Sequence, residues 1–180
     1  MLEHWEGLAR SRGVPVATGV GEEIWMGDIE EVCAGIGWEF HGSLLDVGCG
    51  TGRLARYADG YHGVDIAPAM VAYCQAQGLT ASLVASPADL PDGHWDQGAM
   101  LSVMTHMDRE HRREYLSALR PRVGALLVDI LPGQNGGDIG RMTADAEEFY
   151  DDLTEAGFSV IATFERQARS AANHRYYYCV

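Results

Sequence analysis

Apolar and polar positions follow a regular order through most of this chain. From Ser43 onward, short apolar runs that end in turn signals are followed by segments whose apolar residues recur every three or four positions. The short runs predict seven strands, at residues 43–47, 61–65, 81–85, within 95–104, 123–131, 158–164 and 174–180.

The segments between these runs carry the start and stop signals of helices. They predict a helix that opens at 52–58, one over 68–76 with Gly78 as its exit, one after Asp108 and one from Thr143 to Gly157. Strands that alternate with helices imply an α/β fold, a Rossmann-like, doubly wound and mostly parallel seven-stranded sheet with helices on both faces.

The two ends of the chain depart from this alternation. Only a loop, 165–173, separates the last two predicted strands, so we expect them to pair antiparallel and to give the sheet an antiparallel edge strand. Residues 1–42 have apolar side chains at roughly helical spacing and are expected to cap one end of the sheet. We therefore predict one domain over 1–180, with its core at 43–180.

Composition and charge narrow the class of protein. The chain has 180 residues, enough for one domain, and 47% of them are hydrophobic and 22% charged, which is typical of a globular protein. A net charge of −13 disfavours nucleic acid as a partner. No apolar stretch is long enough to cross a membrane and no signal peptide is recognised, so a cytoplasmic location is expected. Four scattered cysteines favour free thiols over a zinc site, and no metal is expected.

The stretch LLDVGCGTGRL, residues 44–54, carries the first functional signal. Gly48, Gly50 and Gly52 follow the first strand, where glycine permits a positive φ and lets a ligand approach the backbone. The same glycines could serve only to reverse the chain. At the end of the second strand, Asp65 could accept hydrogen bonds from a ribose diol, or could simply cap the helix before Pro68. Together these signals favour a nucleoside ligand. The G-x-G-x-G spacing disfavours a nicotinamide dinucleotide, and no P-loop is present.

Five ordered motifs then carry a family resemblance. They are DVGCGTG (46–52), GVDIAPAM (63–70), ADLP (88–91), WDQGAMLSVMTHM (95–107) and LRPRVGALLVDI (119–130). In this order the chain, from residue 43 to 180, resembles the class I S-adenosylmethionine-dependent methyltransferases. Five motifs in order are more specific than any one of them.

The resemblance implies a site for S-adenosylmethionine along one edge of the sheet. Its residues would hold the methionine part (Asp46, Gly48, Cys49, Gly50, Gly52, Leu101, Ser102), the ribose (Asp65) and the adenine (Ile66, Met70, Ser86, Pro87, Ala88). Two residues depart from the family pattern. Ser86 stands where many relatives have an aspartate, and Ala67 stands where a serine or threonine often caps the following helix.

The acceptor side carries weaker signals. His106 follows the fourth strand, where it could act as a general base, contact the substrate, or only cap the strand. Trp25, with Trp5 and Tyr61, could wall a substrate pocket, although aromatic residues at helical spacing are more often packing residues.

The resemblance leads to a main hypothesis and two alternatives. The main hypothesis is an enzyme that transfers a methyl group to an O or N nucleophile of a small molecule by in-line displacement. The alternatives are an RNA or protein methyltransferase and a non-catalytic S-adenosylmethionine-binding protein. LSVMTHM, at 101–107, lacks the Asn/Asp-Pro-Pro-Tyr/Phe pattern of amino-methylating DNA enzymes. The identity of the acceptor and the oligomeric state stay open.

Overall fold

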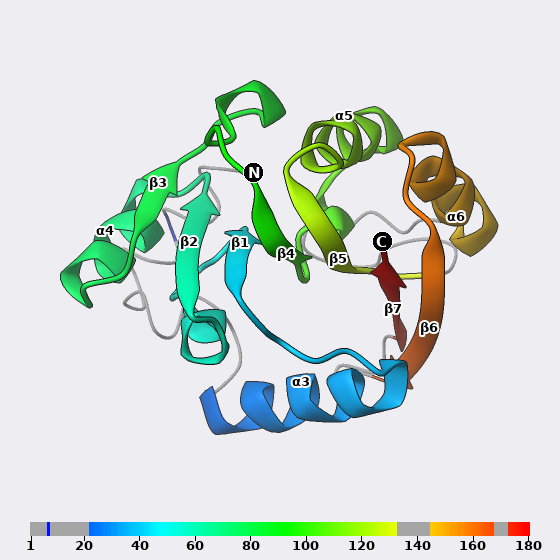
Figure 1. The fold of residues 1–180 in the computed structure, drawn as a ribbon, viewed down its shortest axis with the longest axis horizontal. Coiled ribbons are helices and arrows are strands. Elements are labelled where there is room, and N and C mark those ends of the chain that lie inside the picture. Colours follow the sequence, from blue (N-terminus) through cyan, green and yellow to red (C-terminus); the bar gives the residue numbers. More distant parts are fainter. Residues whose placement is uncertain (1–6, 8–21, 133–144, 168–172) are drawn as a thin grey trace.

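A single mixed sheet organises the molecule (Figure 1). The computed structural model describes residues 7, 22–132, 145–167 and 173–180, with residues 22–27 described by their backbone alone. Its strands are β1 (Ser43–Val47), β2 (Gly60–Asp65), β3 (Ala81–Leu83), β4 (Trp95–Met100), β5 (Val123–Ile130), β6 (Val160–Gln167) and β7 (Asn173–Cys179). They lie in the order β3-β2-β1-β4-β5-β7-β6.

The strand directions confirm the predicted fold class. Strands β1 to β5 pair in parallel, and β7 pairs antiparallel with both β5 and β6. The antiparallel strand is thus next to the edge, and β6 is the edge strand itself. The two strands differ in burial, since β7 buries His174, Tyr177 and Cys179, whereas every second residue of β6 is exposed. The inner strand, β7, is the more buried of the two because it is covered by a neighbour on each side.

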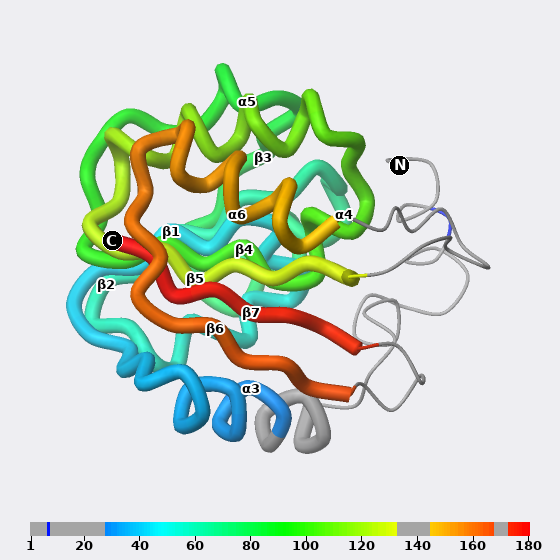
Figure 2. Tube along the Cα trace, turned by 90° about the vertical axis from the view of Figure 1, so that its right-hand side faces the viewer, coloured from blue at the N-terminus to red at the C-terminus, as the bar shows by residue number. Residues whose placement is uncertain are grey.

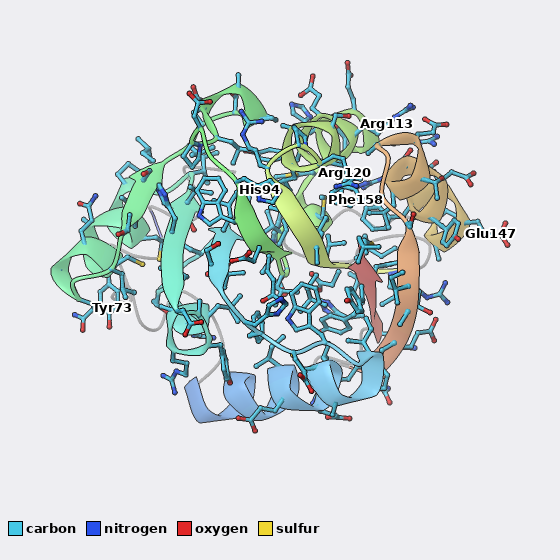
Figure 3. All side chains as sticks on the ribbon, viewed as in Figure 1. Tyr73, His94, Arg113, Arg120, Glu147 and Phe158 are labelled. Carbon is cyan, nitrogen blue, oxygen red and sulfur yellow. The ribbon has the colours of Figure 1, made fainter. Side chains whose placement is uncertain are left out.

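Helices cover both faces of the sheet, because neighbouring strand residues point to opposite sides. Leu45, Met100 and Val128 pack with α5 (Arg109–Leu119) and α6 (Ala146–Glu155). On the other face, Leu44 and Leu127 belong to a cluster with residues of α3 (Glu22–Ile36). Side chains fill the layer between the sheet and α3 (Figure 3). At the far side, α4 (Pro68–Ala76) packs against β2 and β3.

Most of the predicted helices are confirmed, with two differences. Helix α4 has the predicted bounds, and the Asp108 side chain caps α5 by accepting from the backbone N–H of His111 at 2.9 Å. The predicted helix at 52–58 is only the short 3₁₀ helix η1 (Arg53–Tyr57), because just twelve residues separate β1 from β2 and the glycine loop uses the first of them. Helix α6 begins at Ala146 with Asp145 as its cap, and Thr143 lies outside the described residues.

Polar contacts tie α5 to the elements beside it. Asp152 of α6 is fully buried, and Arg109 donates to its carboxylate from Nε and from a terminal nitrogen at 3.1 and 2.9 Å. The Arg120 guanidinium lies 5.2 Å from the centre of the Phe158 ring, and the two side chains can be followed in Figure 3. These contacts fix how α5 and α6 lie on their face of the sheet.

The cysteines and the helices bear on two further features of the chain. All four cysteines are free. Within residues 22–132, 145–167 and 173–180, no helix is both long enough and apolar enough to cross a membrane.

Candidate cofactor and acceptor site

The glycine loop is held at the carboxyl end of β2. The backbone N–H groups of Gly48 and Cys49 both donate to the carbonyl oxygen of Val64, at 2.8 and 3.0 Å. Gly48, Gly50 and Gly52 have φ values of 73°, 52° and 74°, which side chains rarely tolerate. The loop is therefore a built turn whose backbone conformation needs glycine at all three positions.

The surroundings of the loop leave no room for larger residues at two of these positions. A Cβ atom on Gly48 would lie 2.2 Å from Cγ2 of Val103, and one on Gly52 would lie 2.5 Å from a methyl group of Leu79. Cys49, between the first two glycines, is buried. The loop thus has close neighbours in the connections that follow α4 and β4.

Asp65 joins the loop to helix α4. Its Oδ2 accepts from the N–H of Gly50 and its Oδ1 from the N–H of Ala67, both at 2.9 Å. Burial raises the pKa of Asp65, and these backbone donors partly offset that rise. The Asp65 carboxylate therefore does two things. It bonds the backbone just before α4, and it also faces the glycine loop. Ala67 makes no side-chain cap, as its residue type implies.

Asp46 is a buried acid with one described side-chain hydrogen bond. It is 5% exposed, and the hydroxyl of Tyr61 donates to its Oδ2 at 2.8 Å. Burial raises the pKa of Asp46 to about 7; the Tyr61 hydrogen bond lowers it and the charge of Asp65 raises it further. Tyr61, which by sequence could wall a substrate pocket, donates its hydroxyl hydrogen to this carboxylate.

The residues predicted for the adenine lie beside α4 and after β3. Ile66 is half-buried between β2 and α4, and Met70 is buried in the first turns of α4. Ser86 caps the short 3₁₀ helix η2 (Pro87–Asp89), which contains Pro87 and Ala88. Both the N–H and the hydroxyl of Ser86 donate to Oδ2 of Asp89 at 2.9 Å. The Ser86 hydroxyl thus already donates its hydrogen to Asp89, so it can only accept a further hydrogen bond.

The end of β4 has an unusual backbone. Leu101 is half-buried and packs on the α3 side of the core, whereas Ser102 is exposed. Ser102 has a φ of 59°, and no other non-glycine residue among the described ones has a positive φ. Its N–H donates to Oδ1 of Asp129 at 2.5 Å. A carboxylate at the end of β5 thus holds a strained residue at the end of β4.

Sequence reasoning missed the group on the other side of that carboxylate. Asp129 is fully buried, and its Oδ2 lies 2.6 Å from Nδ1 of His174, the second residue of β7. One signal was available. Asp129 is near the end of the predicted fifth strand and His174 begins the predicted last strand, so antiparallel pairing of the two strands would bring them to the same edge. The prediction lacked the order of the strands.

His106 and Trp25 are the two residues predicted to face the methyl acceptor, and the structure describes fewer contacts for them. His106 is half-buried in the 3₁₀ helix η3 (Met104–His106), directly beyond β4, so it lies at the same edge of the sheet. Trp25 lies in α3, but its side chain is outside the described residues, as is all of Trp5.

Comparison with known proteins finds a family similar to the part of the chain that holds the glycine loop. A family model described as "Methyltransferase domain" matches residues 44–123, which include the glycine loop, Asp65 and all of β4. The glycine loop and the strands around it therefore lie in the part of the chain that is similar to this methyltransferase domain family. One protein of the same fold, the magnesium protoporphyrin IX methyltransferase of Synechocystis PCC 6803, was solved with bound S-adenosylmethionine and with bound S-adenosylhomocysteine. A search of curated protein sequences finds no match.

Solved structures of several proteins share the fold of this chain. The magnesium protoporphyrin IX methyltransferase of Synechocystis PCC 6803 has a TM-score of 0.70 at 17% identity, over 98% of this chain and 93% of its own. An S-adenosylmethionine-dependent methyltransferase of Clostridium acetobutylicum ATCC 824 has a TM-score of 0.66 at 14% identity, over 97% and 98%. The [4+2]-cyclase SpnF has a TM-score of 0.65 at 18% identity, over 83% and 78%. Because a protein named as a cyclase shares the fold, the fold by itself does not set the reaction.

Proposed function

We propose that this protein is an S-adenosylmethionine-dependent methyltransferase that transfers a methyl group to an O or N nucleophile of a small molecule, by in-line displacement. The observation that carries the cofactor part is the Asp65 carboxylate facing the N–H of Gly50 in a loop of left-handed glycines. A net charge of −13 supports a small molecule over a nucleic acid. The magnesium protoporphyrin IX methyltransferase, named for a small-molecule substrate, has the same fold.

The residues at this edge fit the parts of the cofactor. Asp46 is a buried carboxylate whose pKa is raised by burial, and the ammonium group of the methionine part would compensate its charge. The oxygens of Asp65 accept backbone N–H groups, among them those of Gly50 and Ala67, and each carboxylate oxygen can accept more than one hydrogen bond, so capacity remains for the ribose hydroxyl groups. Gly50 presents backbone without a Cβ, which would let the methionine part lie against the loop there.

The remaining contacts of the cofactor are part of the same proposal. Ile66 and Met70 would pack on the adenine, and the segment Ser86, Pro87 and Ala88 would follow its edge. Cys49, Gly52, Leu101 and Ser102 would lie along the methionine end. The whole chain would form one domain in the cytoplasm.

When bound, the cofactor supplies a methyl group already activated by a sulfonium. The protein's task is then to orient the acceptor and, where the acceptor atom carries a proton, to remove it. His106, half-buried just beyond β4, stays a candidate for contact with the acceptor, as does Trp25.

Titration calorimetry with S-adenosylmethionine tests the cofactor site. We expect binding by the wild-type chain and a loss of at least about tenfold in affinity for Asp65→Ala. The matched control is Asp92→Ala, since Asp92 is fully exposed and lies before β4, and it should bind as the wild type does. Equal affinity of Asp65→Ala and wild type would contradict the assigned site.

A turnover assay separates the enzyme from a non-catalytic binding protein. Formation of S-adenosylhomocysteine is measured with panels of small hydroxyl compounds and amines, and with RNA and protein substrates. Turnover with a small molecule supports the proposal. Binding of the cofactor with turnover only on RNA or protein, or with no turnover at all, would replace it with the corresponding alternative.

A further inference from the structure

A buried carboxylate at the carboxyl edge of the sheet joins two groups that lie on opposite sides of it. Asp129 is 0% exposed, and its two oxygens have different partners, the N–H of Ser102 and the ring of His174. Burial of an acid is costly unless its charge is compensated by hydrogen bonds or a cation. The pairing of both Asp129 oxygens therefore has to form as the sheet forms, which fixes the position of both partners.

The first partner carries backbone strain. Ser102 adopts a φ of 59° with a side chain in place, which costs about 1–3 kcal/mol at a typical site. Its hydrogen bond to Asp129 holds that conformation. Such strain clusters at functional sites, and Ser102 directly follows the half-buried Leu101 at the end predicted for the methionine part of the cofactor.

The second partner is oriented for proton transfer. Nδ1 of His174 lies 2.6 Å from an acceptor-only carboxylate oxygen, so Nδ1 carries the hydrogen in the neutral ring. The other nitrogen, Nε2, then has its lone pair free. Among the described residues Nε2 has no hydrogen-bond partner. A carboxylate that holds a histidine in this tautomer also stabilises the ring once it gains a proton.

The topology places this pair at the same edge as the cofactor site. Strand β7 is antiparallel to β5, so His174 at its start lies where β5 ends. Figure 2 shows β5 ending and β7 beginning at the same end of the sheet. Ser102 connects the pair to β4, whose neighbour β1 leads into the glycine loop. His174 is thus one carboxylate away from the residue expected beside the reacting end of the cofactor.

We propose that His174, oriented by Asp129, is the general base of this methyltransferase and that the acceptor is a hydroxyl group of phenol type. The inference rests on the proposed function. A carboxylate acceptor carries no proton at neutral pH and would give such a pair nothing to remove. A phenol keeps its proton up to about pH 10 and therefore needs a base at neutral pH.

The proton and electron balance of the step is simple. The acceptor oxygen forms a bond to the methyl carbon, the bond between that carbon and sulfur breaks, and its electron pair stays on sulfur, which becomes a neutral thioether. The acceptor proton passes to Nε2 of His174. The new imidazolium charge is balanced by Asp129, which stays ionised.

The first test uses the protein without any acceptor. Nitrogen-15 NMR of the histidine rings at about pH 8, where imidazoles are mostly neutral, reports which nitrogen carries the hydrogen. We expect His174 to carry it on Nδ1 and Asp129→Asn to shift the ring toward the other tautomer. A hydrogen on Nε2 in the wild type would overturn the proposal, since no lone pair would face the acceptor.

The second test measures transfer to a series of phenols of graded acidity, together with calorimetry of S-adenosylmethionine. We expect His174→Ala to bind the cofactor as the wild type does and to lose about 10²–10⁴-fold in kcat. The loss should be smallest for phenols that are already ionised at the assay pH, and added imidazole should restore part of it. A purely structural role would give neither the acidity trend nor the rescue.

Two further variants keep the test decisive. His174→Gln can still donate to Asp129 but cannot take up a proton, so it should lose kcat as His174→Ala does, even if the alanine variant folds poorly. The matched control is His111→Ala, because His111 is an exposed histidine whose Nδ1 lies 2.8 Å from Oδ1 of Asp108 on α5. It should keep wild-type kcat.

The outcomes separate this proposal from the proposed function. Absence of cofactor binding in the wild type would remove the proposed function itself. Cofactor binding without transfer to any phenol, or transfer only to amines, would overturn the hydroxyl acceptor. Transfer at wild-type kcat by His174→Gln would overturn the base.

Discussion

Replacing Asp46 by asparagine should make the protein more stable and, at the same time, a poorer binder of S-adenosylmethionine. Asp46 is buried, and burial raises its pKa from the usual 3.8 to about 7. Its ionised form is therefore disfavoured in the folded chain without a ligand. Asparagine carries no charge and still offers an oxygen to the Tyr61 hydroxyl, which donates to Oδ2 of Asp46 at 2.8 Å.

The magnitude follows from the pKa difference. In the unfolded chain the carboxyl group ionises near pH 4, whereas in the folded chain it ionises only near pH 7. The stability of the wild type should thus fall as pH rises from about 4 to about 7 and level off above that. Three pKa units at 1.36 kcal/mol each correspond to about 4 kcal/mol at pH 8. Because the new amide N–H₂ needs a partner, we expect a net gain of about 2–4 kcal/mol for Asp46→Asn.

Denaturant unfolding of both proteins at pH 5 and pH 8 measures this difference. The gain should be several-fold larger at pH 8, and calorimetry at pH 8 should show an affinity for S-adenosylmethionine at least about tenfold lower, because the ammonium group loses its carboxylate. Asp92→Asn, at a fully exposed position, is the control and should change neither quantity. A loss of stability at pH 8, or an equal gain at both pH values, would refute the account of the buried charge.

Two further substitutions test the loop and the α5–α6 contact. Gly48→Ala places a Cβ 2.2 Å from Val103 at a φ of 73° and should lower both stability and cofactor affinity. Gly37→Ala has a similar φ of 69° with nothing near its Cβ, so unfolding assays should show only the strain of about 1–2 kcal/mol. Asp152→Ala removes the buried carboxylate to which the partly exposed Arg109 donates, and should lower the unfolding free energy by more than a change at an exposed ion pair does. Glu155→Ala removes an exposed ion pair and should cost less than about 1 kcal/mol in the same assay; equal losses would contradict the burial argument.

The chain by itself determined the elements that depend on local pattern. The apolar runs predicted the strands, and Pro68 with Gly78 predicted the bounds of α4, because strand alternation, helical period and capping residues act within a few positions of each other. The same local order put Asp65 at a strand end next to the glycine loop. Parallel strands bring such ends together, so the contact between Asp65 and Gly50 followed from the predicted fold class.

Only the tertiary structure decided the contacts that depend on strand order and side-chain reach. The position of β7 between β5 and β6 places His174 beside Asp129, forty-five positions away in the chain, and no local period encodes that neighbour. Likewise, Tyr61 bonds Asp46 because β1 and β2 pair in one register. Short sequence motifs encode the residues at the edge proposed to hold the cofactor. The pair of His174 and Asp129, proposed to act on the acceptor, forms only when β5 and β7 pair in their long-range antiparallel register.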